Sequence, residues 1–127
     1  QNIVKATDLN SEWTLIKEQD GIKLYISTEG CKIGPLEKPL EYVFIKIENQ
    51  NSESKDLYFQ FGLHYDEGCE GCEEHNESKR AITLEANSTT ECDCTFENGN
   101  LSYLIINPNY ADTKVLEGIE LINFKID

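Results

Sequence analysis

The strongest structural signal in this chain lies in Trp13-Thr14-Leu15-Ile16-Lys17-Glu18-Gln19-Asp20-Gly21-Ile22-Lys23-Leu24-Tyr25-Ile26-Ser27. Asp20-Gly21 is a preferred centre for a type I′ turn, because both positions of that turn need positive φ. The flanking residues alternate between apolar and polar, which predicts a β-hairpin. A two-residue turn pairs Glu18 with Lys23 and Leu15 with Ile26. The apolar face of this hairpin then gathers Trp13, Leu15, Ile22, Leu24 and Ile26.

Outward from the hairpin, the same alternation recurs to the end of the chain. Strands are predicted at 41–49, 57–65, 80–86, 101–106 and 116–126, with a short one at 92–96 and a bulge at Gly118. This is an all-β pattern, typical of an antiparallel two-sheet sandwich, immunoglobulin-like in the broad sense, with seven or eight strands. A small closed barrel is the alternative. The predicted core holds Trp13, Leu15, Ile45, Ile47, Phe59, Phe61, Leu84 and Leu121.

Length and charge limit the classes of function. The 127 residues fit one domain over 1–127, with residues 1–12 as a loosely ordered lead-in. Asp and Glu number 24 against 11 Lys and Arg, a net charge of −13. This excess argues against nucleic-acid partners and anionic membrane surfaces, and it favours a monomer. No apolar run is long enough to suggest membrane insertion.

The cysteines indicate the compartment. Five of them, at Cys31, Cys69, Cys72, Cys92 and Cys94, are many for a reduced cytosolic domain of this size. The chain starts at Gln1 and has no Met, so we expect that a leader has been removed, as a signal peptide or by trimming. The predicted location is extracytoplasmic: periplasmic, cell-surface or secreted. All five are disulfide candidates, with Cys69–Cys72 as one bridge and Cys31 paired with Cys92 or Cys94 as the other.

A metal site is the competing interpretation of the same cysteines. Cys69-x-x-Cys72 followed later by Cys92-x-Cys94 resembles a zinc spacing, which makes these four weak metal candidates. Within a strand, however, Cys-x-Cys would put both sulfurs on one face, where they converge poorly. The acidic loop 66–77 lacks the alternate spacing of a calcium loop, so a solvated tip is the simpler prediction there.

Catalytic signals are weak. His64 is predicted to point outward from a strand, and His75 lies in the acidic loop, with no motif of a hydrolase, metalloprotease or phosphate-binding loop. Cys69-x-x-Cys72 lacks the helix N-terminus of thioredoxin-type sites, and its acidic neighbours disfavour a thiolate. No enzymatic activity, catalytic residue or cofactor is therefore predicted. Outward aromatics at Tyr42, Phe44 and Tyr58 form a protein- or sugar-binding platform or are covered by a loop.

One resemblance spans most of the chain. The hairpin Trp13, Asp20-Gly21-Ile22 and Tyr25 is followed by Cys31, by Lys46 with Asn49, by Cys92 or Cys94, and by Leu116-Ile119-Asn123. This outline resembles a loose group of uncharacterised exported β-sandwich proteins of Bacteroidetes-type bacteria. The resemblance implies a location and a fold, and it brings no known activity.

Two functions follow as hypotheses. The first is a non-catalytic exported binding or accessory module for a protein or glycan partner. The alternative is a domain stabilised by zinc or calcium, which the cysteine-rich acidic loop organises.

Overall fold

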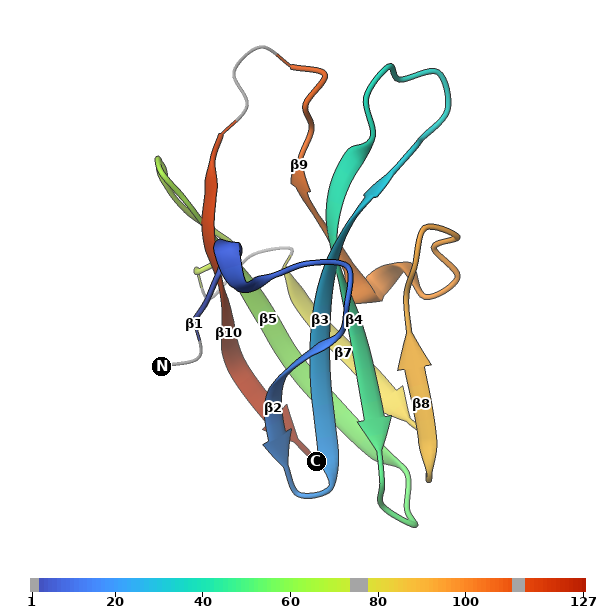
Figure 1. The fold of residues 1–127 in the computed structure, drawn as a ribbon. Helices are drawn as coiled ribbons and strands as arrows, with labels where there is room; N and C mark the ends of the chain where they lie inside the picture. The colour runs from blue at the N-terminus through green and yellow to red at the C-terminus, as the bar shows by residue number, and fades with distance from the viewer. Residues whose placement is uncertain (1–2, 74–77, 111–113) are drawn as a thin grey trace.

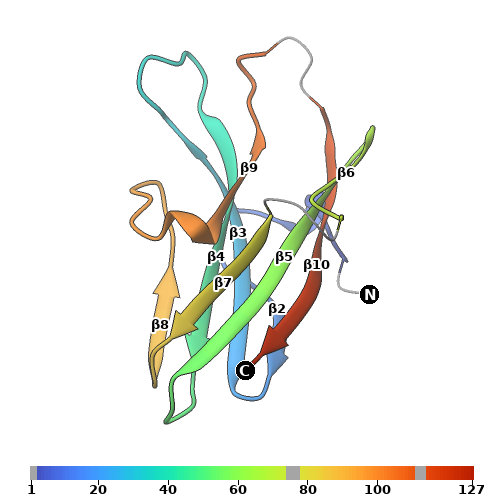
Figure 2. The same cartoon turned by 180° about the vertical axis from the view of Figure 1, so that it is seen from behind.

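The structure, a computed structural model, describes residues 3–73, 78–110 and 114–127. These residues form ten β-strands in two antiparallel sheets of five strands, and the sheets pack face to face (Figures 1 and 2). No α-helix occurs in the described parts of the chain. The predicted all-β sandwich is thus confirmed, and the closed barrel is wrong because each sheet keeps its own edges.

Each sheet is built around one long strand. In the β5 sheet, β5 (Lys55–Tyr65) pairs with β10 (Leu116–Ile126) along one side. Along its other side it pairs with two shorter strands, β6 (Gly68–Glu70) and β7 (Lys79–Leu84). The far side of β10 pairs with β1 (Ile3–Lys5). In the β4 sheet, β4 (Leu40–Asn49) pairs with β3 (Ile22–Cys31), β8 (Ser88–Glu91) and β9 (Ser102–Ile106), while β2 (Thr14–Gln19) pairs with β3. Two short 3-10 helices, η1 (Ala6–Asp8) and η2 (Gly99–Leu101), lie between strands.

The count of seven or eight strands was too low. Three short strands, β1, β6 and β8, have only three or four residues each and carry no apolar alternation of their own. They are strands because a longer neighbour offers its backbone groups for pairing. Conversely, the strand predicted at 92–96 is wrong, since β8 ends at Glu91 and the chain turns there.

The first hairpin forms as predicted at its turn but not along its length. Asp20 and Gly21 have φ values of 49° and 79°, and Glu18 pairs with Lys23. An irregularity between Leu15 and Lys17 shifts the register, so that Leu15 lies opposite Tyr25 rather than Ile26. Leu15 is therefore 45% exposed, which corrects its predicted place in the core.

The core lies between the two sheets. The predicted core residues Ile45, Ile47, Phe59, Phe61, Leu84 and Leu121 are buried there, and Trp13 packs against them while remaining partly exposed. Residues 3–8, inside the predicted lead-in, form β1 and η1, and Val4 packs against the same core. Among the described residues, no helix has the length and apolar character needed to cross a membrane.

The last strand carries the predicted bulge. The pairing of β10 with β5 shifts between Leu116 and Gly118, and it shifts again between Ile122 and Lys125. Within the second shift Asn123 has a φ of 54°, a conformation that Asn tolerates better than most side chains. Such bulges re-aim side chains, and here Asn123 reaches the outer face of the β5 sheet.

Candidate functional site

Two disulfides account for four of the five cysteines. Cys31, at the end of β3, bonds Cys94 in the loop after β8, and Cys69 in β6 bonds Cys72 just beyond it. Both predicted bridges are confirmed, and Cys94 rather than Cys92 is the partner of Cys31. Cys92 is a buried free thiol, and burial raises the pKa of that thiol.

The four weak metal candidates therefore lie in two separate places. Cys69 and Cys72 lie over the outer face of the β5 sheet, whereas Cys92 and Cys94 belong to the loop after β8. Because the chain turns after Glu91, the sulfurs of Cys92 and Cys94 have different surroundings: one is buried and the other bonds Cys31. The structure does not bring the two pairs together.

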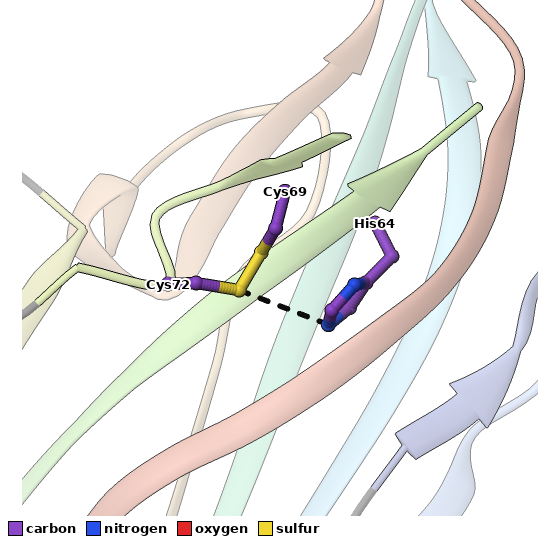
Figure 3. A group of neighbouring side chains, drawn as sticks. All are labelled: His64, Cys69 and Cys72. Carbon is purple, nitrogen blue, oxygen red and sulfur yellow. Dashed lines mark hydrogen bonds between the residues drawn. A yellow bond between two sulfur atoms is a disulfide. The ribbon is translucent and has the colours of Figure 1, made fainter. Parts of the chain in front are cut away.

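Cys69 and Cys72 instead share a cluster with a histidine (Figure 3). Alternation along β5 puts His64 on the outer face, directly opposite Cys69 of β6. The His64 Nε2 atom lies 3.7 Å from Cys72 Sγ and 2.8 Å from Oε1 of Glu120 on β10. The sequence did not predict this cluster, because its members come from three strands. We call His64, Cys69, Cys72 and Glu120 the disulfide–histidine cluster.

Gly62 makes room for this cluster on β5. A Cβ atom added at Gly62 would lie 2.6 Å from Cys72 Sγ and 3.1 Å from Cys69 Sγ. Only the missing side chain lets the disulfide lie directly on the sheet. Gly71, inside the cysteine loop, has a φ of 85°, and a Cβ there would lie 2.6 Å from the Phe61 carbonyl oxygen. The loop thus approaches β5 closely at two glycines.

Gln60 anchors the same loop. Its side chain is 1% exposed, and Nε2 donates to the carbonyl oxygens of Gly71 (2.8 Å) and Glu73 (3.0 Å). Its Oε1 accepts a hydrogen bond from Asn123 Nδ2 at 3.2 Å. Gln60 sits at an outward position of an alternating strand, which the pattern assigns to solvent, so sequence reasoning missed it.

The acidic tip next to the cluster is partly neutralised. Lys114 forms an ion pair with Glu70, and hydrogen bonding to Glu70 followed by its charge raises the pKa of Lys114, with Glu67 and Asp66 adding to the effect. Asp66 also accepts a hydrogen bond from the backbone of Val115. His75 and its neighbours at 74–77 lie outside the described residues.

A pocket of about 520 Å³ opens beside the cysteine loop on the outer face of the β5 sheet. Its lining is Tyr58, Phe59, Gln60, Lys79, Arg80, Ala81 and Asn123. Tyr58 is 38% exposed, and Lys125 Nζ lies 5.9 Å from its ring centroid. Arg80 stacks on Tyr103 at 4.2 Å and donates to the Asn100 carbonyl oxygen, which fixes this wall of the pocket. We call this cavity the Tyr58 pocket.

The three outward aromatics do not form one platform. Tyr42 and Phe44 lie on β4, and Phe96 from the loop after β8 covers them with ring centroids 4.9 and 5.8 Å away. Phe44 is consequently 1% exposed. Tyr58 lies on the other sheet, where it keeps an accessible ring. A loop therefore covers the β4 aromatics, as one of the two predicted alternatives had it, whereas Tyr58 stays accessible to a ligand.

Comparison with known proteins adds no assignment to this geometry: no protein-family model matches the chain, and a search of curated proteins found no match.

Proposed function

We propose that the protein is a non-catalytic, extracytoplasmic binding module that takes a glycan in the Tyr58 pocket. The observation that carries this proposal is the lining of the pocket: an accessible tyrosine beside the exposed amide of Asn123. Binding sites commonly combine an aromatic or apolar wall with a few fixed polar groups. Sugars offer both partners, because their C–H faces stack on aromatic rings and their hydroxyls pair with amides.

The polar groups of the pocket are held before any ligand arrives. Asn123 is fixed by the bulge in β10 and by its bond to the buried Gln60, which two bonds to the cysteine loop hold in place. Such preorganisation lowers the entropic cost of binding. Lys79 lines the pocket and Lys125 Nζ lies 5.9 Å from the Tyr58 ring centroid. This positive charge, on a chain of net charge −13, favours acidic or neutral sugars over cationic ligands.

The location and fold type belong to the same proposal. Two disulfides in a domain of this size fit an oxidising compartment, which is the setting of exported proteins. The resemblance to exported β-sandwich proteins, which rests on motifs between Trp13 and Asn123, also supports an extracytoplasmic location. We also assign the sandwich to the broad immunoglobulin-like class. The alternative expectation was a protein partner. The lining of the Tyr58 pocket favours a glycan over that alternative.

The test is affinity electrophoresis in native gels that contain soluble polysaccharides such as xylan, laminarin, pectin and mucin. We expect at least one of them to retard the wild-type protein, and Tyr58→Ala to remove the retardation. Tyr110→Ala is the matched control, because Tyr110 is 71% exposed and lies outside the Tyr58 pocket. Absence of retardation by every polysaccharide, or equal retardation of Tyr58→Ala, would reject the glycan assignment.

A further inference from the structure

We propose that the disulfide–histidine cluster is a zinc site that is closed by oxidation and opens when the Cys69–Cys72 disulfide is reduced. The ligands are the two sulfurs and His64 Nε2, and Glu120 would complete the set after a side-chain movement. This site differs from the one that the cysteine spacing predicted, because it uses neither Cys92 nor Cys94. The site shares Gln60 with the neighbouring Tyr58 pocket, but its ligands are other residues and it does not rest on the glycan proposal.

The distance between His64 and Cys72 fits one tetrahedral ion. Zinc binds thiolate sulfur at about 2.3 Å and imidazole nitrogen at about 2.0–2.1 Å, so a sulfur and a nitrogen on one ion lie about 3.6 Å apart. The His64 Nε2 atom lies 3.7 Å from Cys72 Sγ, and the ligand atoms of His64, Cys69 and Cys72 all lie within 4.8 Å of one another. In Figure 3 the imidazole edge faces the disulfide sulfurs.

Glu120 would supply the fourth ligand after a side-chain movement, because its carboxylate does not lie within 4.8 Å of all three other ligand atoms. Its Oε1 atom is 2.8 Å from the same His64 nitrogen, and an oxygen and a nitrogen bound to one zinc ion lie about 3.4 Å apart. Rotation of the carboxylate about its own side-chain bonds would have to bring this oxygen closer to the two sulfurs as well. His64 and Glu120 are 33% and 23% exposed in their side chains, so an ion from solvent can reach both groups.

The disulfide is what closes the site. Two thiolates on one zinc ion lie about 3.8 Å apart, which a covalent S–S bond forbids. Two equivalents of a thiol reductant transfer two electrons to the bond: Cys69 and Cys72 become thiols, and the reductant becomes a disulfide. Zinc then replaces the two thiol protons, which pass to solvent, and forms two Zn–S bonds. Gln60 continues to hold the loop through Gly71 and Glu73, so the sulfurs stay above His64.

The test compares zinc binding by oxidised and reduced protein. Reduction uses a phosphine, which does not compete for the metal as a thiol would, followed by anaerobic removal of the reductant and titration against a chromogenic chelator. We expect one zinc ion per reduced chain and none per oxidised chain. With Co²⁺ as the probe, thiolate-to-metal charge-transfer bands should appear only in the reduced protein. Zinc should also raise the thermal midpoint of the reduced protein.

Variants separate this site from adventitious binding to free thiols. His64→Ala and Glu120→Gln should each weaken zinc binding about tenfold or more, as loss of a group that holds a metal does. Cys92→Ser and Glu117→Gln are the matched controls, since they remove a thiol and a carboxylate outside the cluster and should leave the affinity unchanged. Circular dichroism of each reduced variant establishes that it is folded. Unchanged affinity in His64→Ala, loss in Cys92→Ser, or no stoichiometric zinc in the reduced protein would overturn the assignment.

Discussion

At the scale of single residues, Phe61 joins the two sheets. It is fully buried on β5, and its ring centroid lies 5.7 Å from that of Phe59 and 5.4 Å from that of Tyr103 on β9. Phe61→Ala should lower the free energy of unfolding by about 3–5 kcal/mol, because it removes buried surface and leaves a cavity. Urea unfolding measures this loss. Leu15→Ala, at an exposed apolar position, is the control and should change stability far less; equal losses would contradict the inward register of β5.

Gly62 carries a prediction about the cysteine loop. An alanine Cβ would lie 2.6 Å from Cys72 Sγ, so Gly62→Ala should lift the Cys69–Cys72 loop off the sheet. The disulfide should then be reduced faster, which mass spectrometry follows after timed addition of reductant. Gly99→Ala is the matched control, because nothing lies within 4 Å of the position that its Cβ would take. Equal reduction rates in the two variants would mean that the loop does not depend on contact with Gly62.

Phe61 and Gly62 also show which features of the structure the sequence predicts and which it does not. Alternation along β5 was enough to predict that Phe61 is buried, because that pattern is local to the strand. The roles of Gly62 and His64 depend on Cys69, Cys72 and Glu120, whose positions relative to β5 are set by pairing between strands. Local periodicity contains no information about such partners, so the cluster was not predictable.

At the scale of elements, the sequence predicts the long strands β3, β4, β5 and β10 but not the short edge strands. The long strands bury an apolar face, so their sequences alternate between apolar and polar residues and predict them. The bulge at Gly118 was predicted because a glycine interrupts such an alternation. β6 and β8 have no such face, and backbone pairing alone makes them strands. The shift at Ile16 in the first hairpin is a similar case, because the turn predicts a regular register that packing of Ile16 against the core overrides.

Two tyrosines connect elements and predict the alkaline limit of stability. Tyr65 Oη on β5 donates to the Ile105 carbonyl oxygen on β9, and Tyr103 Oη donates to the Ser78 carbonyl oxygen before β7. Burial raises the pKa of Tyr65 and of Tyr103 from 10.0 to about 12. The unfolded chain therefore loses these protons first, so their stabilisation is complete below about pH 10 and is lost as pH rises towards about 12.

The expected decrease is on the order of 1–3 kcal/mol for each tyrosine across that range. Urea unfolding from pH 8 to pH 12 measures it, in a Cys92→Ser background so that a thiolate does not exchange with the disulfides. Tyr103→Phe should flatten part of the slope, whereas Tyr110→Phe, at an exposed position, should not. An identical slope in Tyr103→Phe would show that another group governs alkaline unfolding.

At the scale of the whole molecule, the net charge of −13 predicts solution behaviour. Mutual repulsion should keep the protein monomeric near neutral pH, and solubility should be lowest near its pI of 4.4, where the repulsion vanishes. Light scattering and turbidity as functions of pH check both expectations. Binding to DNA or to anionic vesicles at moderate salt would contradict the charge argument.

The two disulfides should contribute very unequally to the stability of the whole molecule. Cys31–Cys94 spans a sequence separation of 63 residues, for which the chain-entropy model gives about 4 kcal/mol, whereas Cys69–Cys72 spans 3 residues and restricts the unfolded chain far less. Reduction should therefore lower the thermal midpoint sharply, and Cys31→Ser should reproduce most of that loss while Cys72→Ser should not. Calorimetry of the two variants measures the difference, and peptide mapping of the wild type should find Cys92 as the free thiol. If mapping instead found Cys31 or Cys94 unpaired, the long loop would be open and the predicted order of the two variants would no longer follow.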